Sequence, residues 1–217
     1  MTTWSDRAQA YRESPTHREG PDLDLVVEWC EPAEGVKALD VATGGGHVAR
    51  RLREDGAQVV TLDPSPGMQA DVLGSAEHLP FDDGSFDVVV TRIAPHHFAD
   101  VRAAVAEMAR VSNRLVVIED TLFSSERQEE AEKLRDPTHV RNYSEDEWAE
   151  FLTEAGLEVE QAECFEKIHA LEAWLARTGC EGAEAVRVRE LLADRMTEDG
   201  SAWTDTKIVI RARKSQT

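Results

Sequence analysis

The sequence predicts an α/β fold in which a mostly parallel sheet is covered by helices on both faces. Short apolar runs rich in β-branched residues alternate with helical patterns along the chain, and this alternation is typical of parallel strands joined by helices. The runs at 86–91 and 115–119 are apolar enough for strands buried on both faces. With 217 residues, of which 41% are hydrophobic, the chain can build one domain with a sizeable core.

The elements follow from these patterns in chain order. Strands are expected at 36–41, 58–62, 86–91, 115–119, 157–164 and 207–212, and helices at 23–30, 47–54, 101–111, 144–155, 170–177 and 183–196. Ser144, with Glu147 three residues later, is a capping-box pattern for a helix start. Trp148 and Phe151 lie three residues apart on the same helix, which favours a place in the core.

One connection is too short for an ordinary parallel crossover. Only a few residues separate Asp63, at the end of the second strand, from the next possible strand at 70–73, whereas such crossovers normally take a dozen or more. We therefore expect at most one helical turn, at 65–69. The third strand should be truncated and lie at the sheet edge, because a loss there leaves the rest of the sheet intact.

The charge balance argues against two classes of partner. Asp and Glu number 43 against 24 Lys and Arg, a net charge of −19, whereas nucleic acids and anionic membranes attract clustered basic residues. No apolar run approaches the ~18 residues of a membrane span, and the start of the chain lacks the apolar block of a secretory signal. Cys30, Cys164 and Cys180 suit free thiols in a reducing compartment, so we expect a cytoplasmic protein. The sequence leaves the oligomeric state open between a monomer and a homodimer.

The most informative block is the glycine-rich turn ALDVATGGGHVA at 38–49. An apolar strand ends in Asp40, the glycines let the chain turn sharply against a ligand, and a helix begins at His47. Asp63 ends the next strand nineteen residues after Gly44, where a carboxylate can accept hydrogen bonds from ribose hydroxyls. These features predict an adenosine-type site at the carboxyl ends of the strands.

The same block fits two further interpretations. Gly44 to Ala49 also satisfies the G-x-G-x-x-A pattern of nicotinamide and flavin sites, so an oxidoreductase with a nucleotide cofactor must be considered. The second interpretation is a glycine turn that binds no ligand.

The next block, GSAEHLPFDDGSFD at 74–87, resembles the class I S-adenosylmethionine-dependent methyltransferases, and within them the ubiquinone/menaquinone-biosynthesis-like (type 11) group. That family combines D-x-x-x-G-x-G after one strand, an acid closing the next strand, and G-(D/T)-A-E-x-L-P-F-x-D-x-S-F-D. Here residues 40–46 match the D-x-x-x-G-x-G element, and Asp63 is the acid that closes the next strand. The D-x-S-x-x-M pattern that usually follows runs from Asp63 to Met68. The resemblance extends through TRIAPHHF and LRDPTHVR and covers most of the chain.

The resemblance implies a Rossmann-like, seven-stranded type of sheet with an antiparallel last strand. It further implies a single domain over 1–217, with a helical cap at 1–35 and substrate-side inserts at 121–143 and 165–202. The implied activity is S-adenosylmethionine-dependent methyl transfer to a small-molecule acceptor. The alternatives are S-adenosylmethionine binding without transfer and a nucleotide-cofactor oxidoreductase, which the lack of room for a separate substrate domain disfavours.

S-adenosylmethionine, the implied cofactor, would lie along the glycine turn. The backbone of 42–46 would hold its methionine end, and Asp63 would hold its ribose. Met68 and Ser75 would border the adenine, while Arg92 would face the methionine moiety. The full implied set is Asp40, Ala42, Thr43, Gly44, Gly45, Gly46, His47, Asp63, Pro64, Met68, Ser75, Ala76, Glu77 and Arg92.

The sequence departs from the family pattern in three places. The helix and strand that normally follow Met68 are nearly deleted before Gly74, which would open the adenine side of the pocket. The usual L-K-P-G-G before the fifth strand is reduced to VSNR. Ser75 stands where many relatives place an Asp, and its hydroxyl would make a weaker contact to the adenine amine.

Two histidines follow the fourth strand at the mouth of the site. They could act as a base or orient the acceptor, because imidazole titrates near neutrality, or they could cap and pack. Tyr11 and His17 of the N-terminal cap segment either reach the pocket or are ordinary cap residues. The catalytic candidates are His97, His96 and Tyr11, and the substrate-binding candidates are His17, Asp120, Arg135 and His139.

Other side chains near the acceptor end have two interpretations each. Arg135 either binds substrate or pairs with Asp136 or a nearby Glu. Trp174 and Trp203 either line an apolar acceptor pocket or close a small helical layer, which is the favoured interpretation. No metal is expected, because adjacent histidines on a loop rarely both bind one without nearby carboxylates.

Overall fold

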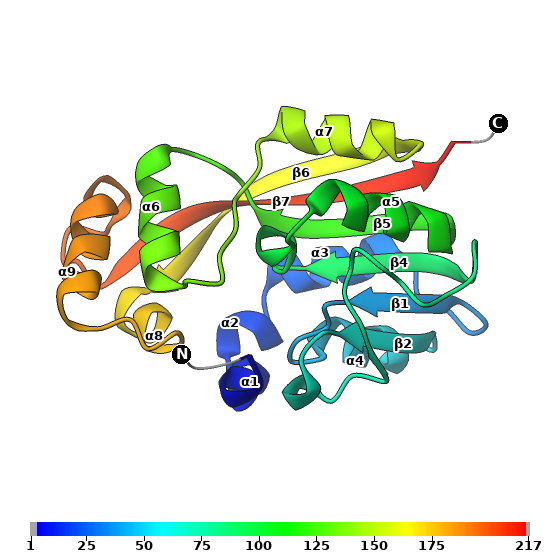
Figure 1. The fold of residues 1–217 in the computed structure, drawn as a ribbon, viewed down its shortest axis with the longest axis horizontal. Helices are drawn as coiled ribbons and strands as arrows, with labels where there is room; N and C mark the ends of the chain where they lie inside the picture. Colours follow the sequence, from blue (N-terminus) through cyan, green and yellow to red (C-terminus); the bar gives the residue numbers. More distant parts are fainter. Residues whose placement is uncertain (1–3, 216–217) are drawn as a thin grey trace.

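Within residues 4–215, which the computed structural model describes, helices cover both faces of one mixed sheet and a helical lobe stands at one end (Figure 1). The sheet has seven strands in the order β3-β2-β1-β4-β5-β7-β6. Their bounds are β1 (Lys37–Val41), β2 (Gln58–Asp63), β3 (Val72–Leu73), β4 (Phe86–Arg92), β5 (Ser112–Thr121), β6 (Leu157–Ala170) and β7 (Ala202–Lys214). The predicted Rossmann-like α/β fold is confirmed.

Strand directions agree with the prediction as well. β1 pairs in parallel with β2 and β4, and β4 pairs in parallel with β5. β7 runs antiparallel between β5 and β6, which confirms the predicted antiparallel last strand. Because the parallel strands end at the same edge, Asp63 of β2, Arg92 of β4 and the glycine turn after β1 come together there.

The truncated edge strand is also confirmed. β3 has two residues, which pair with Leu62 and Asp63 of β2, and Leu73 is 63% exposed at this edge. The connection from β2 holds a single helical turn, η1 (Pro66–Met68). The shortened crossover therefore removes structure from the margin of the sheet and leaves its centre intact.

Two apolar cores hold helices against opposite faces of the sheet. On one face lie α3 (Pro21–Cys30) and α4 (His47–Glu54), which bury Leu23 and Leu52. On the other lie α5 (Val101–Val111) and α7 (Glu145–Glu154). Trp148 and Phe151 of α7 are buried in that core, as their spacing predicts. No helix within residues 4–215 is long and apolar enough to cross a bilayer.

The start of α7 offers a test of the capping prediction. Ser144 accepts a hydrogen bond from Glu147 N–H, and the Glu147 side chain accepts one from Ser144 N–H, so both halves of the capping box are present. Ser144→Ala is expected to lower the free energy of unfolding by about 1 kcal/mol, measured by urea denaturation. Ser144→Thr keeps the hydroxyl and should stay close to the wild-type value; equal losses in both variants would contradict the capping role.

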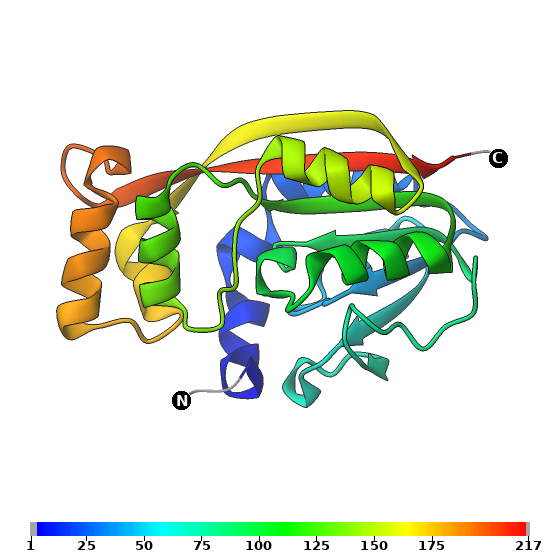
Figure 2. The ribbon, with the colours of Figure 1, turned by 45° about the horizontal axis from the view of Figure 1, so that its top comes forward.

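β6 and β7 continue past the central sheet as a two-stranded ribbon into the lobe (Figure 2). The lobe contains α6 (Glu126–Arg135), α8 (Leu171–Ala176), α9 (Gly182–Leu191) and η3 (Ala193–Arg195), and its own core includes Trp174 and Trp203. Both strands are longer than predicted, because outside the sheet their residues alternate between exposed and buried and form no apolar run. α6 falls in the range that the sequence left without an element.

The N-terminal helices α1 (Trp4–Glu13) and α2 (Pro15–Arg18) lie between the lobe and the carboxyl ends of β1 and β2 (Figure 1). Of the range 1–35 that the resemblance assigns to a cap, these two helices occupy the cap position, whereas α3 packs against the sheet. A Cβ on Gly67 would lie 2.5 Å from Ser5 Cα, so α1 rests directly on η1.

Candidate active site

A cavity of about 310 Å³ opens at the carboxyl edge of the sheet and continues beneath the lobe. It is bordered by the glycine turn, the cap helices, the loop η2 (Pro95–His97) that follows β4, and the ribbon of β6 and β7. Most of the predicted site residues line it: Tyr11, His17, Asp40, Ala42, Thr43, Gly44, Gly45, His47, Asp63, Pro64, Met68, Ser75, Ala76, Glu77, Arg92, His96, His97 and Arg135. Gly46, Asp120 and His139 are not among the lining residues.

Asp40 organises the glycine turn from behind. Its carboxylate accepts hydrogen bonds from Thr43 Oγ1 at 2.6 Å and from Ala49 N at 3.2 Å, which ties the turn to the first turn of α4. Burial raises the pKa of Asp40 to about 6, against the effect of these hydrogen bonds. Ala42 and Gly44 have φ values of 54° and 52°, and the left-handed conformation at Ala42 is a strained one that the surrounding structure maintains.

Asp63 faces the turn from the end of β2. Its Oδ2 accepts from Gly44 N at 3.0 Å and its Oδ1 accepts from Ser65 N at 2.9 Å. Burial raises the pKa of Asp63, although both backbone hydrogen bonds oppose the shift. A carboxylate has about four lone-pair positions, so two remain for further donors.

The cap is joined to the glycine turn at one close contact. His47 Nε2 lies 3.1 Å from the backbone oxygen of Tyr11. A Cβ on Gly45 would lie 2.6 Å from His47 Nε2 and 3.1 Å from Tyr11 O, so a larger residue would displace the His47 ring and press on the cap. Gly45 therefore allows α1 to close over the turn, and His47 serves this closure.

Arg92 lies on the floor of the cavity within a buried charge network. It forms ion pairs with Asp22 and with Glu119, the latter at 2.6 Å between Nε and Oε2, and it donates to His17 O at 3.1 Å. Lys167 Nζ adds a second cation, 2.5 Å from Asp22 Oδ2. The charges of Arg92 and Lys167 are thus balanced by carboxylates of the protein.

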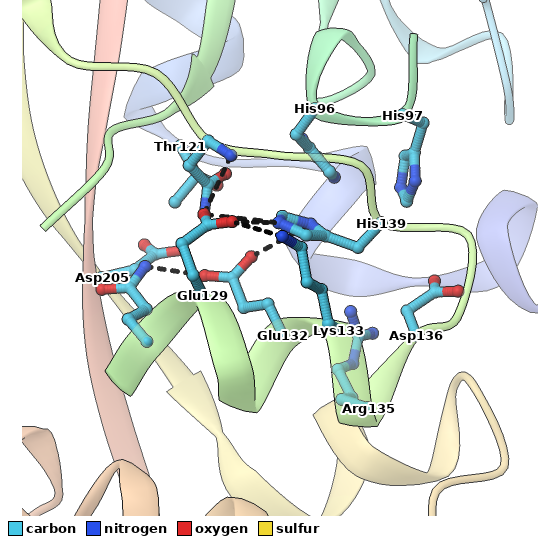
Figure 3. A network of polar contacts seen from close by, with 12 residues as sticks. His96, His97, Thr121, Glu129, Glu132, Lys133, Arg135, Asp136, His139 and Asp205 are labelled. Carbon is cyan, nitrogen blue, oxygen red and sulfur yellow. Dashed lines mark hydrogen bonds and ion pairs between the residues drawn. The ribbon is translucent and has the colours of Figure 1, made fainter. Parts of the chain in front are cut away.

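Three histidines gather above α6, as Figure 3 shows. The ring centroids of His96 and His97 are 4.1 Å apart, and that of His139 is 5.3 Å from His96. His96 Nδ1 lies 2.5 Å from Asp120 Oδ1, and His97 Nδ1 lies 3.0 Å from the backbone oxygen of Thr138. His97 also packs edge-on against Trp4 of the cap.

His96 and His97 are neutral near pH 7. Burial, followed by the charge of His139, lowers the pKa of His96 well below its usual value. Burial and the neighbouring His96 lower the pKa of His97 to about 3. Burial raises the pKa of Asp120 to about 7. When Asp120 is ionised, a neutral His96 donates its Nδ1–H to the carboxylate and keeps Nε2 free of a proton, which is the arrangement of an oriented base.

His139 stands one layer behind the cavity and is anchored to α6. Its Nε2 lies 3.3 Å from Glu129 Oε2 and its Nδ1 lies 3.6 Å from Glu132 Oε2 (Figure 3). Burial would lower the pKa of His139, but the hydrogen bond to Glu129 and the charge of Glu132 outweigh it and raise the pKa. The residue therefore holds the loop after α6 in place behind His96. Among the described residues, no group of three or more His, Cys, Asp and Glu has the arrangement of a metal site.

The ribbon of β6 and β7 supplies lining residues that sequence reasoning did not select. Lys207 Nζ lies 3.0 Å from Asp205 Oδ2 and 2.5 Å from Thr121 Oγ1, and His169 Nε2 lies 3.1 Å from Asp205 Oδ2. The alternation of positions along each strand places them on one face, and this spacing of polar and aromatic residues was the signal available. The set is Lys167, His169, Asp205 and Lys207; Trp203, for which the sequence offered an acceptor pocket as one of two interpretations, lines the cavity beside them.

Comparisons with known proteins identify the family of the chain. A family described as "Methyltransferase domain" matches residues 39–114. The uncharacterized methyltransferase YcgJ of Bacillus subtilis is 30% identical over 201 residues, which are 82% of this chain and 79% of that protein. The solved structure of YcgJ has a TM-score of 0.80 and covers 90% of this chain and 98% of that chain, at 25% identity. A Bacillus halodurans structure described as a candidate methyltransferase has a TM-score of 0.79 at 27% identity and covers 91% of this chain and 100% of that chain.

Demethylmenaquinone methyltransferase of Beutenbergia cavernae is 39% identical over 98 residues. That match spans 39% of this chain and 41% of the relative, so it covers less than half of either protein. The chain belongs to the class I S-adenosylmethionine-dependent methyltransferases. It is a methyltransferase enzyme whose acceptor the relatives do not identify.

Proposed function

We propose that the cavity binds S-adenosylmethionine at its sheet end and a small-molecule acceptor at its lobe end. The observation that carries the proposal is the continuous cavity from Asp63 and the glycine turn to the histidines of η2. A cavity of about 310 Å³ in a protein of charge −19 favours a small molecule over a nucleic acid.

The residues at the sheet end fit the cofactor. Asp63 keeps two lone-pair positions for the ribose hydroxyls, and the bare backbone at Gly44 and Gly45 would border the methionine end. Met68 and Ser75 line the part that would receive the adenine. When bound, S-adenosylmethionine supplies a methyl group on a positively charged sulfur, which needs alignment and a dry site more than it needs chemical assistance.

The protein's own residues would align the acceptor and manage its proton. α1 and α2 exclude water from above, because Tyr11 closes on His47. His96 would take a proton from an acceptor that holds one, with Asp120 keeping the imidazole in the tautomer that leaves Nε2 unprotonated. Tyr11 and His97 line the same cavity and both pack against Trp4, and they would contact the acceptor there.

A change at His97 tests its place in the site. His97→Ala is expected to lower turnover by about tenfold or more and to leave cofactor affinity within about threefold, because its ring lies at the acceptor end. Initial rates and calorimetry on the same preparation separate the two effects. Turnover equal to that of the wild type would remove His97 from the site.

Calorimetry separates the proposed function from its rivals. The expected result is tight binding of S-adenosylmethionine and S-adenosylhomocysteine without binding of NAD. Binding of NAD alone would favour an oxidoreductase. Turnover of S-adenosylmethionine against a panel of metabolites then distinguishes an enzyme from a protein that binds the cofactor without transfer.

A further inference from the structure

We infer that the acceptor carries an anionic group of the carboxylate or phosphate class, which binds Arg135 and Arg177 beside Trp174. The inference rests on the proposed function, because it names the chemistry of the molecule at the lobe end of the same cavity. It follows from two arginines that face the cavity without a carboxylate partner.

Arg135 lies at the end of α6 and is held in place by the ring of Trp174. Its Nε donates to Trp174 O at 3.1 Å, and its guanidinium carbon lies 4.3 Å from the centroid of the Trp174 ring. The Nη2 atom is buried and makes no hydrogen bond to the described residues. Burial lowers the pKa of Arg135, because the charged guanidinium loses part of its solvation there. An orphaned donor of this kind indicates a missing acceptor.

Arg177 follows α8 and lies close enough to Arg135 for the two charges to repel. Its Nη2 donates to Thr16 Oγ1 at 3.1 Å, a neutral partner. Burial and the charge of Arg135 lower the pKa of Arg177 to about 10. Two neighbouring guanidinium groups beside one cavity form a fork for carboxylate or phosphate oxygens.

The other cationic side chains that line the cavity are paired with carboxylates. Arg92 and Lys167 are paired with Asp22, and Lys207 is paired with Asp205. Among the side chains that the structure describes, no carboxylate lies within ion-pair distance of Arg135 or Arg177, in a chain with 43 acidic and 24 basic residues. The pair therefore stands out against the general excess of acids.

The neighbouring acid is engaged elsewhere. Asp136, which follows Arg135 in the chain, pairs with Arg7 at 3.1 Å and accepts from Thr138 Oγ1 at 2.7 Å. Figure 3 shows the Asp136 and Arg135 side chains without a contact between them. The pairing with Asp136 that the sequence left open is not formed, which leaves the guanidinium available for a ligand.

The position favours the acceptor over the cofactor as the source of the anion. Arg135 and Arg177 come from the lobe, whereas the cofactor-binding turn and Asp63 lie at the ends of β1 and β2, across the cap (Figure 1). Trp174 and Trp203 line the same end of the cavity and form part of the lobe's apolar core. An acceptor with an apolar or aromatic body and one acidic group matches this surface.

Benzoate and inorganic phosphate serve as probes, with benzamide as the uncharged match to benzoate. Each is titrated into the whole protein with and without saturating S-adenosylhomocysteine, by calorimetry and by tryptophan fluorescence, since Trp174 packs on Arg135. We expect saturable binding of at least one anion, at least about tenfold weaker binding in Arg135→Gln and in Arg177→Gln, and no change in Arg187→Gln, since Arg187 pairs with Glu130 outside the cavity. Equal binding of benzamide and benzoate with no binding of phosphate, or anion affinities that the two Gln variants leave unchanged, would overturn the inference.

A second set of titrations tests whether the two arginines bind the acceptor or the carboxylate of the cofactor. S-adenosylhomocysteine and 5′-methylthioadenosine, which lacks the carboxylate, are titrated into the same variants. We expect both affinities to stay within about threefold of wild type, because the arginines act on the acceptor. A selective loss for S-adenosylhomocysteine would assign the arginines to the cofactor's carboxylate and overturn the inference. Failure of the wild type to bind S-adenosylhomocysteine would instead count against the proposed function, while the probe titrations without it still test the anion site.

Discussion

His96→Ala is expected to lower the rate of methyl transfer by about 100-fold or more, while the affinity for S-adenosylhomocysteine stays within about threefold. The reason is the geometry of the buried pair that His96, which lines the cavity, forms with Asp120 behind it at 2.5 Å. Burial lowers the pKa of His96, so its imidazole is unprotonated at neutral pH, and its loss removes the base from an acceptor that must be deprotonated.

Initial rates on an acceptor identified in the metabolite panel provide the measurement. His78→Ala removes an exposed imidazole outside the cavity and should leave the rate unchanged. Asp120→Asn should lower the rate in the same direction as His96→Ala, since an amide no longer enforces the productive tautomer. A His96→Ala rate within about threefold of wild type would mean that the acceptor needs no base from this residue.

Asp63→Asn is expected to weaken the binding of S-adenosylhomocysteine at least about tenfold, because hydrogen bonds to a charged group contribute roughly 1.5–3 kcal/mol and 1.4 kcal/mol is a factor of ten. The amide keeps the size of the side chain and one oxygen acceptor, but it offers the ribose hydroxyls no charge. Asp63 also accepts from Gly44 and Ser65, so the thermal midpoint of the variant is measured alongside the affinity.

Asp82→Asn is the matched control for this variant, because Asp82 is exposed and lies outside the cavity. Calorimetric titration of both variants under the same conditions gives the comparison. An Asp63→Asn dissociation constant equal to that of Asp82→Asn would reject the ribose role.

The sheet end of the site could be predicted because its chemistry is local in the sequence. The strand, the glycine turn and the helix at 38–54 are consecutive, and the short crossover after Asp63 alone indicates a truncated edge strand. Parallel strands then bring Asp63 and Arg92 to the same edge without further information.

The lobe end could not be predicted in the same way. α6 reads ERQEEAEKLR, and the side chains that it buries include Gln128, Glu129 and Glu132. A helix that buries polar groups has no apolar stripe to reveal it. The partner of Asp136 is Arg7, which lies 129 residues away, so nothing near Arg135 in the sequence indicates that its guanidinium stays unpaired.

The cap described above covers both halves of the cavity with one short piece of chain. Tyr11 closes on His47 through its backbone, while its phenol lies in the field of Arg135 and Arg177. If both ligands bind as proposed, detachment of α1 would widen the cavity for the nucleoside and for the acceptor at once. We therefore expect the turnover rate to depend on how readily α1 detaches from η1 and the glycine turn.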